Sequence, residues 1–315
     1  MSKRPHSEIA LTSLLCDLMD EDIDTDIMLD YSLQHLQNDL QHEDNLFGIS
    51  LAINTAQFKP QHERYISQSD IGLKLEFENL IEPKESWIKY YLLQAKKLFP
   101  TSEIPLKYTE AARFASVDKL QGKRIIALNE ILGGSYVKYM LYCPRPDKVD
   151  EDTKTKLAYL RTKKLSEEIF DFTYGQHLYQ ALLNNGESLK AGLFLADSGS
   201  MNFGEVHAMI LGDTCPLSWF IAINFLHKNQ HLHSRLYSAS PMSSQSPSGS
   251  EPSQRLLEGI MSGDCKVIEE LISKIRDVVP DKLIDNVLVL PKHIIKLRVS
   301  VGEQLNHNNR RIRME

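Results

Sequence analysis

The stretch from Ser188 to Asn224 holds the residues whose types and spacing could do chemistry. His207 stands at the start of one apolar run, and Asn224 ends the next. Glycines separate the apolar runs of this stretch, and this pattern predicts three consecutive strands. They are Leu189–Ala196, Val206–Leu211 and Ser218–Asn224. A histidine at a strand end, oriented by a side chain on the adjoining strand, has the geometry of a general base. The alternative is a histidine satisfied within a small sheet, and the spacing alone favours it.

The elements that would position these residues follow from the apolar spacing of the rest of the chain. Amphipathic helices are predicted at Ile9–Met19, Ser86–Phe99 and Arg255–Ile275, the last interrupted at Ser262-Gly263-Asp264. A short strand is predicted at Ile49–Ile53, and a β-hairpin at Arg124–Leu132 and Ser135–Tyr142. Pro144–Lys164 is predicted to be a solvent-exposed segment with a helix at its end. The pair Gly133-Gly134 supplies the turn of the hairpin, and it is not a phosphate loop because no GKS or GKT follows.

Length and charge bound the class of protein. The 315 residues suffice for one large domain or two smaller ones. A net charge of −6 and a pI near 6.0 argue against a nucleic-acid binder, since phosphate binding needs a basic field. The charge is uneven, because residues 1–45 are acidic and residues 291–315 are rich in Lys and Arg. The basic end is therefore a candidate local anion site.

The cysteines and histidines give no metal signature. The four cysteines are widely spread, without a CxxC pair, and this pattern is typical of free thiols in a reducing compartment. Three histidines within residues 227–233 lack a carboxylate or cysteine at ligand spacing, so we predict no metal site. No apolar run reaches the roughly 18 residues of a membrane span, and the N-terminus lacks a signal-peptide core.

Composition divides the chain into two parts. Residues 1–45 are predicted to form an acidic N-terminal helical arm, and residues 46–315 the main domain. Within the main domain, Ser238–Ser253 is a low-complexity stretch that is too poor in apolar residues to pack, and it predicts a flexible loop.

Two passages resemble the YopJ family of bacterial effector acetyltransferases, whose fold is similar to that of Ulp/SENP-type cysteine proteases. The first is LYQALLNNGESLKAGLFLADSGSMNFGEVHAMILGD followed by PLSWFIAIN, and the second is PDKLIDNVLVLPKHIIKLRVSVGEQLN. A weaker likeness lies in SWIKYYLLQAKKLFPTSEIPLKYTEAARF. The resemblance covers about half of the chain. It implies an α+β, papain-like fold with a small central mixed sheet flanked by helices, and an insertion at about residues 115–165.

The resemblance also implies site residues. His207 takes the place of the family's general base, and Asn224 the place where the family has Glu or Asp; an asparagine orients an imidazole in papain-like sites. Cys265, after the polar turn Ser262-Gly263-Asp264, is one placement of the nucleophile. The rival placement puts Pro252 at the cysteine's position and Gln245 near the oxyanion-hole glutamine, which leaves the site without a nucleophile. Both placements stay open.

The implied function is transfer of an acetyl group from acetyl-CoA to Ser, Thr or Lys of a host protein. The family's inositol hexakisphosphate would bind four residues of the basic end: Lys292, His293, Lys296 and Arg298. The alternatives are a catalytically silent relative that binds proteins, a cysteine protease or deubiquitinase on the same fold, and an unrelated interaction protein. The resemblance further implies delivery into the host cytoplasm by a specialised bacterial system.

Overall fold

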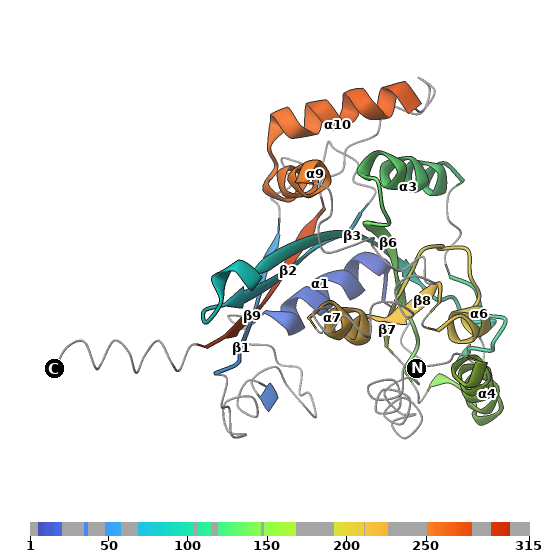
Figure 1. Cartoon of the computed structure of the whole chain (residues 1–315). Helices are drawn as coiled ribbons and strands as arrows, with labels where there is room; N and C mark the ends of the chain where they lie inside the picture. Colours follow the sequence, from blue (N-terminus) through green and yellow to red (C-terminus); the bar gives the residue numbers. More distant parts are fainter. Residues whose placement is uncertain are drawn as a thin grey trace.

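The computed structural model describes residues 6–20, 35–36, 48–57, 69–103, 106–114, 119–145, 148–167, 192–210, 212–225, 251–278 and 291–302. Within these residues the architecture is α+β, with a mixed central sheet between two layers of helices (Figure 1). This confirms the coarse fold class that the sequence predicts.

The described part of the chain forms a seven-stranded sheet, whose order across the sheet is β1-β9-β2-β3-β6-β7-β8. The strands are β1 (Ser50–Gln57), β2 (Ile71–Asn79), β3 (Trp87–Lys97), β6 (Val137–Tyr142), β7 (Leu193–Ala196), β8 (Thr214–Pro216) and β9 (His293–Val301). The β9–β2 and β3–β6 pairs are parallel, and the other neighbours are antiparallel. Two further short strands, β4 (Ser102–Glu103) and β5 (Leu106–Lys107), pair with each other.

Helices cover both faces of the sheet. They are α1 (Glu8–Met19), α3 (Lys119–Leu132), α4 (Glu151–Glu167), α6 (Phe203–Ala208), α7 (Leu217–Phe225), α9 (Glu251–Ser262) and α10 (Cys265–Val278), with a 3-10 turn η2 (Pro83–Glu85) before β3. α1 and α7 lie on one face, and α3 and α9 on the other, with α10 stacked on α9 and α3 (Figure 1). α4 packs against α6 at the β7–β8 end.

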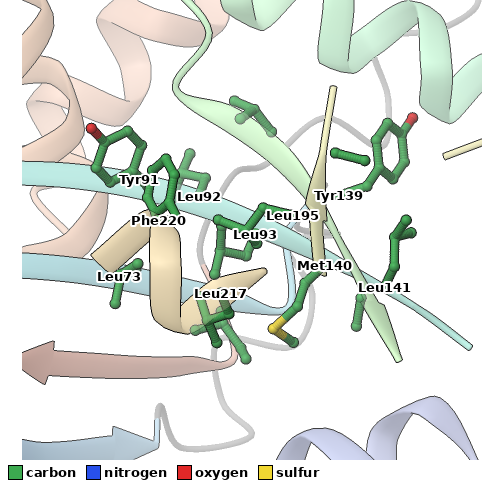
Figure 2. Packing of buried hydrophobic residues seen from close by; sticks show 14 of the residues in the cluster. Leu73, Tyr91, Leu92, Leu93, Tyr139, Met140, Leu141, Leu195, Leu217 and Phe220 are labelled. Carbon is green, nitrogen blue, oxygen red and sulfur yellow. The ribbon is translucent and has the colours of Figure 1, made fainter. Parts of the chain in front are cut away.

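The register of β3 assigns its side chains to these two faces. Tyr91 points to the α7 face, where its ring meets Phe220 of α7 edge-on at 4.8 Å (Figure 2). Leu92 points to the α9 face, because it pairs with Gly72, and a Cβ on Gly72 would overlap Met261 of α9. Strands covered on both faces are apolar at nearly every position, and β3 is buried from Lys89 to Lys96.

The predicted helix at Ser86–Phe99 is therefore wrong, because this segment contains β3. Its aromatic residues and isoleucine favour a strand, and the apolar spacing that indicated a helix reflects burial on both faces. The predicted hairpin is also wrong in its first half, because Arg124–Leu132 belongs to α3 and only its partner forms a strand. Gly133 has φ of 68°, and the pair Gly133-Gly134 ends α3 by donating to Glu130 O and Asn129 O.

Four other predicted elements are confirmed. α1 covers the predicted helix at Ile9–Met19, and β1 the predicted strand at Ile49–Ile53 except for its first residue. The interrupted helix is divided into α9 and α10, because Gly263 has φ of 74° and the Asp264 carboxylate accepts from Lys266 N at the start of α10. The helix predicted at the end of Pro144–Lys164 is α4.

Described elements lie within both of the segments predicted as an arm and as an insertion. α1, inside the predicted arm, packs against β1, β3 and β9, and its Cys16 belongs to the core. The predicted insertion at residues 115–165 supplies β6, a central strand, so this segment is integral to the sheet. The predicted serine-rich loop lies outside the described residues, apart from residues 251–253, which begin α9. Among the described helices, none is both long and apolar enough to cross a membrane.

Candidate functional site

His207 lies in a helix, and the predicted strand at Val206–Leu211 is wrong. Asn202 and Glu205 form a capping box in which each side chain binds the other residue's backbone N–H, and this starts α6. The fold buries His207 completely, at 0% exposure. The rings of Phe194 and Phe203 stand edge-on to the imidazole at 5.2 Å and 5.1 Å.

The hydrogen bonds of His207 fix its protonation state. Arg161 Nη1 lies 3.1 Å from His207 Nδ1, and a guanidinium only donates, so Nδ1 is the acceptor and the proton is on Nε2. Nε2 has no partner among the described residues. Burial, with a smaller effect of the Arg161 charge, lowers the pKa of His207 to about 3. A general base needs a pKa near the working pH, so this imidazole is a neutral core group.

Asn224 does not orient His207. It lies in α7, so the strand predicted at Ser218–Asn224 is also wrong. Its Oδ1 accepts from Lys89 Nζ at 3.0 Å and from Tyr91 Oη at 3.0 Å, and its Nδ2 donates to Phe220 O at 2.8 Å. The carboxamide is buried and engaged on both atoms by groups other than the imidazole.

Cys265 stands apart from both residues. It is the first residue of α10, its side chain is exposed, and its Sγ lies 3.9 Å from Gly263 O. Figure 1 separates α10 from α6, since α10 packs on α9 and α3 while α6 packs on α4. The rival position Pro252 is exposed in α9, on the same side of the molecule as α10, and Gln245 lies outside the described residues. The structure therefore brings none of the three predicted catalytic residues together.

The four residues predicted to bind inositol hexakisphosphate do not converge either. They lie in or next to β9, a central strand where the resemblance implies a helix. His293 is buried on the α1 face, where burial lowers its pKa, while Lys296 and Arg298 point to the opposite face. Arg298 Nε lies 3.7 Å from Glu76 Oε2, and the charge of Lys292 acts on Asp70. This donor set does not form one anion site.

A polar cluster that the sequence analysis missed surrounds Asn224. Lys89 and Tyr91 reach it from alternate positions of β3, on the face that α7 covers. Lys89 Nζ also lies 4.9 Å from the centroid of the Trp87 ring, and Trp87 packs against Phe225 with ring centroids 5.2 Å apart. Burial lowers the pKa of Lys89 to about 8. No sequence signal marks this cluster, because 135 residues separate Lys89 from Asn224.

A second buried lysine has different surroundings. Lys138 in β6 is 0% exposed, and its Nζ donates to Asp197 Oδ1 at 2.8 Å and to Ser135 Oγ at 3.0 Å. Ser135 Oγ in turn donates to Asp197 Oδ1 at 2.7 Å. Burial lowers the pKa of Lys138, and the charge of Asp197 opposes that shift. This trio binds β6 to the end of β7. Burial also raises the pKa of the neighbouring Cys215 thiol to about 12, so that thiol is inert.

Comparison with known proteins gives no relative. No protein-family model matches the chain, and no match is found among curated proteins or solved structures. The described residues also contain no group of three His, Cys, Asp or Glu side chains that could hold a metal ion. Function must therefore be argued from the geometry of the chain itself.

Proposed function

We propose that this chain is a protein-binding module on a YopJ-like, papain-type fold, without a working Cys/His site. The observation that carries the proposal is the separation of His207, Asn224 and Cys265, each of which is held by other partners. Acyl transfer through a thiolate requires nucleophile and base near hydrogen-bond reach, and so does a cysteine protease or deubiquitinase. The mixed sheet flanked by helices supports retention of the fold.

The binding surface that we propose is the part of the sheet face beside α9 that stays exposed, which we call the β2–β9 face; at its edge Tyr90 is 7% exposed and hydrogen-bonds to Glu258 of α9. The strand register places two rows of side chains there: Ile88, Glu76, Arg298 and Ala52 in one row, and Tyr90, Lys74, Lys296 and Asn54 in the other. The next row contains Gly72, which α9 covers through Met261. Beyond this contact the sheet extends past α9 (Figure 1).

The charge of the β2–β9 face favours an acidic protein segment as its partner. The two rows carry three cations and one carboxylate, and Glu78 and Glu258 border them at the adjoining row and at α9. Lys74 and Arg298 both approach Glu76, at 2.8 Å and 3.7 Å. Within the described part of the chain Lys296 is exposed and makes no ion pair. Ile88, 43% exposed, adds an apolar contact beside these charges.

The catalytic part of the proposal is tested with radiolabelled acetyl-CoA, with and without inositol hexakisphosphate. We expect no label on the chain under either condition, and Cys265→Ala should behave as the native protein does. Label that appears on native protein and disappears in Cys265→Ala would overturn the proposal in favour of an acyltransferase. A ubiquitin probe that traps active-site cysteines tests the protease alternative in the same way.

The binding part is tested by the fluorescence anisotropy of a labelled glutamate-rich peptide. Lys296→Glu should weaken binding about tenfold or more, because it places like charges opposite each other. The matched control is Lys84→Glu, an exposed charge reversal in η2 outside the two rows, which should leave the affinity unchanged. Equal losses in both variants, or none in either, contradict the assignment of the β2–β9 face.

A further inference from the structure

We propose that Lys89 is a reactive amine, whose Nζ forms an imine with the carbonyl group of a small, uncharged, apolar or aromatic aldehyde. This goes beyond the binding function and uses the opposite face of the sheet. Lys89 points toward α7, where its Nζ lies 3.0 Å from Asn224 Oδ1 and 4.9 Å from the Trp87 ring centroid. Among the described residues, the hydrogen-bond acceptor of the Lys89 amine is thus the neutral carboxamide of Asn224.

Lys89 differs from Lys138 in its partner, although burial lowers the pKa of both amines. The ammonium of Lys138 is held by the Asp197 carboxylate, whereas no carboxylate pairs with Lys89 within the described residues. Burial without an opposing anion lowers the pKa of Lys89 to about 8. At about pH 8 the neutral, nucleophilic fraction is then about a hundredfold larger than for an ordinary lysine, whose pKa is about 10.4. Lys89 is 6% exposed, and desolvation by apolar surroundings is an established way to activate a lysine toward carbonyls.

The surrounding side chains define the class of ligand. Trp87 and Phe225 are only partly buried, and their rings lie beside the amine. Tyr91 closes the inner side, where its ring packs edge-on against Phe220 (Figure 2). This cluster contains no second cation to attract an anion and no carboxylate to attract a cation. An uncharged ligand with an aromatic or aliphatic body therefore fits it.

The chemistry balances without any further reagent. Lys89 first releases its ammonium proton to solvent, and the nitrogen lone pair then forms a bond to the carbonyl carbon while the C=O π bond breaks. The oxygen takes up a proton to give a carbinolamine, and the nitrogen loses its second proton. Loss of the hydroxyl as water leaves a C=N bond to Lys89. Asn224 Oδ1, which accepts from Nζ in the free protein, orients the remaining N–H during the addition.

The test is trapping of the full-length chain with benzaldehyde and borohydride, which reduces an imine to a stable benzylamine that peptide mass spectrometry locates. We expect Lys89 to be modified at about pH 8 several-fold faster than the exposed Lys84, with its rate rising to half-maximum near that pH. The native protein gives this result without any variant. Slower modification of Lys89 than of Lys84 at about pH 8 would overturn the proposal.

Two variants sharpen the test. Asn224→Asp places a carboxylate against Nζ, which favours the ammonium, so modification of Lys89 at about pH 8 should fall about tenfold and recover at higher pH. An unchanged rate in Asn224→Asp contradicts the proposal. Lys84→Arg is the matched control and should leave the Lys89 rate as it is. Because the readout is covalent modification of Lys89, it is independent of the peptide-binding and acetyl-CoA experiments.

Discussion

The chemistry available to a side chain in this molecule depends on its partners more than on its type. His207 and Asn224 are residues that a catalytic site would use, and both are buried in the sheet's two helical layers. Arg161 donates to His207 and Lys89 donates to Asn224, from 46 and 135 residues away in the sequence. The sequence identifies candidate residue types, but partners at such separations depend on strand order and register, which local spacing does not reveal.

The buried imidazole of His207 should make stability depend on pH. Its pKa is about 3 in the folded chain and about 6.5 when unfolded, so folding favours the neutral form. The stabilisation is complete above pH 6.5 and is lost as the pH falls from there toward 3. Between about pH 7.5 and pH 5 this group alone should cost about 2 kcal/mol of unfolding free energy. Urea unfolding across that range measures it.

The matched variant is His207→Asn, whose carboxamide oxygen can accept from Arg161 but does not titrate. We expect it to be less stable than the native chain at about pH 7.5, because it leaves a cavity beside Phe194 and Phe203. The difference should shrink as the pH falls toward 5. A difference that stays constant over this range would mean that His207 is not the titrating group.

At the scale of elements, the amphipathic helices α1, α9 and α10 were predicted, whereas α3, α6 and α7 were predicted as strands and β3 as a helix. α9 and α10 carry one apolar stripe each and a glycine–aspartate break, which local sequence encodes directly. β3 is covered by α7 on one face and α9 on the other, so apolar residues lie on both of its faces, among the buried polar residues Lys89, Gln94 and Lys96, and their spacing imitates a helix. The capping box of α6 is visible in the sequence as Asn202 and Glu205, and it was the available signal against a strand there.

The contact between α9 and the sheet gives a prediction at this scale. Gly72 in β2 lies directly under Met261, so Gly72→Ala forces the methionine to move. We expect a loss of about 1 kcal/mol in unfolding free energy, at the low end of what overpacking usually costs, because the clashing atoms are the flexible end of Met261. Combining it with Met261→Ala should remove the clash. Chemical denaturation of the single and double variants gives the coupling energy.

The two substitutions should therefore be strongly non-additive. Met261→Ala alone costs stability, because this side chain is 7% exposed and belongs to the core. In that background Gly72→Ala should become neutral or slightly stabilising. Simple additivity of the two losses would show that α9 does not sit on Gly72.

At the scale of the whole molecule, β9 is the last described strand in the sequence, and it lies between the first two, β1 and β2. It pairs with β1 on one side and with β2 on the other, over eight and nine residue pairs. The family resemblance implies a basic helix for this segment, where the alternation of buried and exposed residues, from Ile295 to Arg298, is short. Burial of His293 and Leu297 against the α1 face made it a central strand.

Removal of β9 should therefore abolish the fold. A chain ending at residue 290 leaves β1 and β2 without their shared neighbour, and their backbone N–H and C=O groups without partners. We expect the cooperative urea transition, monitored by circular dichroism, to be lost. A chain ending at residue 302 keeps every described strand and should retain the native midpoint. Cooperative unfolding of the shorter chain would contradict the placement of β9.

The pairing of Ser50 with Ser300 also has a consequence for biosynthesis. A ribosome adds about 5–20 residues per second, so β9 emerges roughly 12–50 s after β1. During that interval the edges of β1 and β2 that pair with β9 have no partner, and they are exposed to other strands and to chaperones. A sheet closed by such distant segments has a high contact order and folds slowly. Nascent chains should accordingly depend on chaperones until the last described strand has been made.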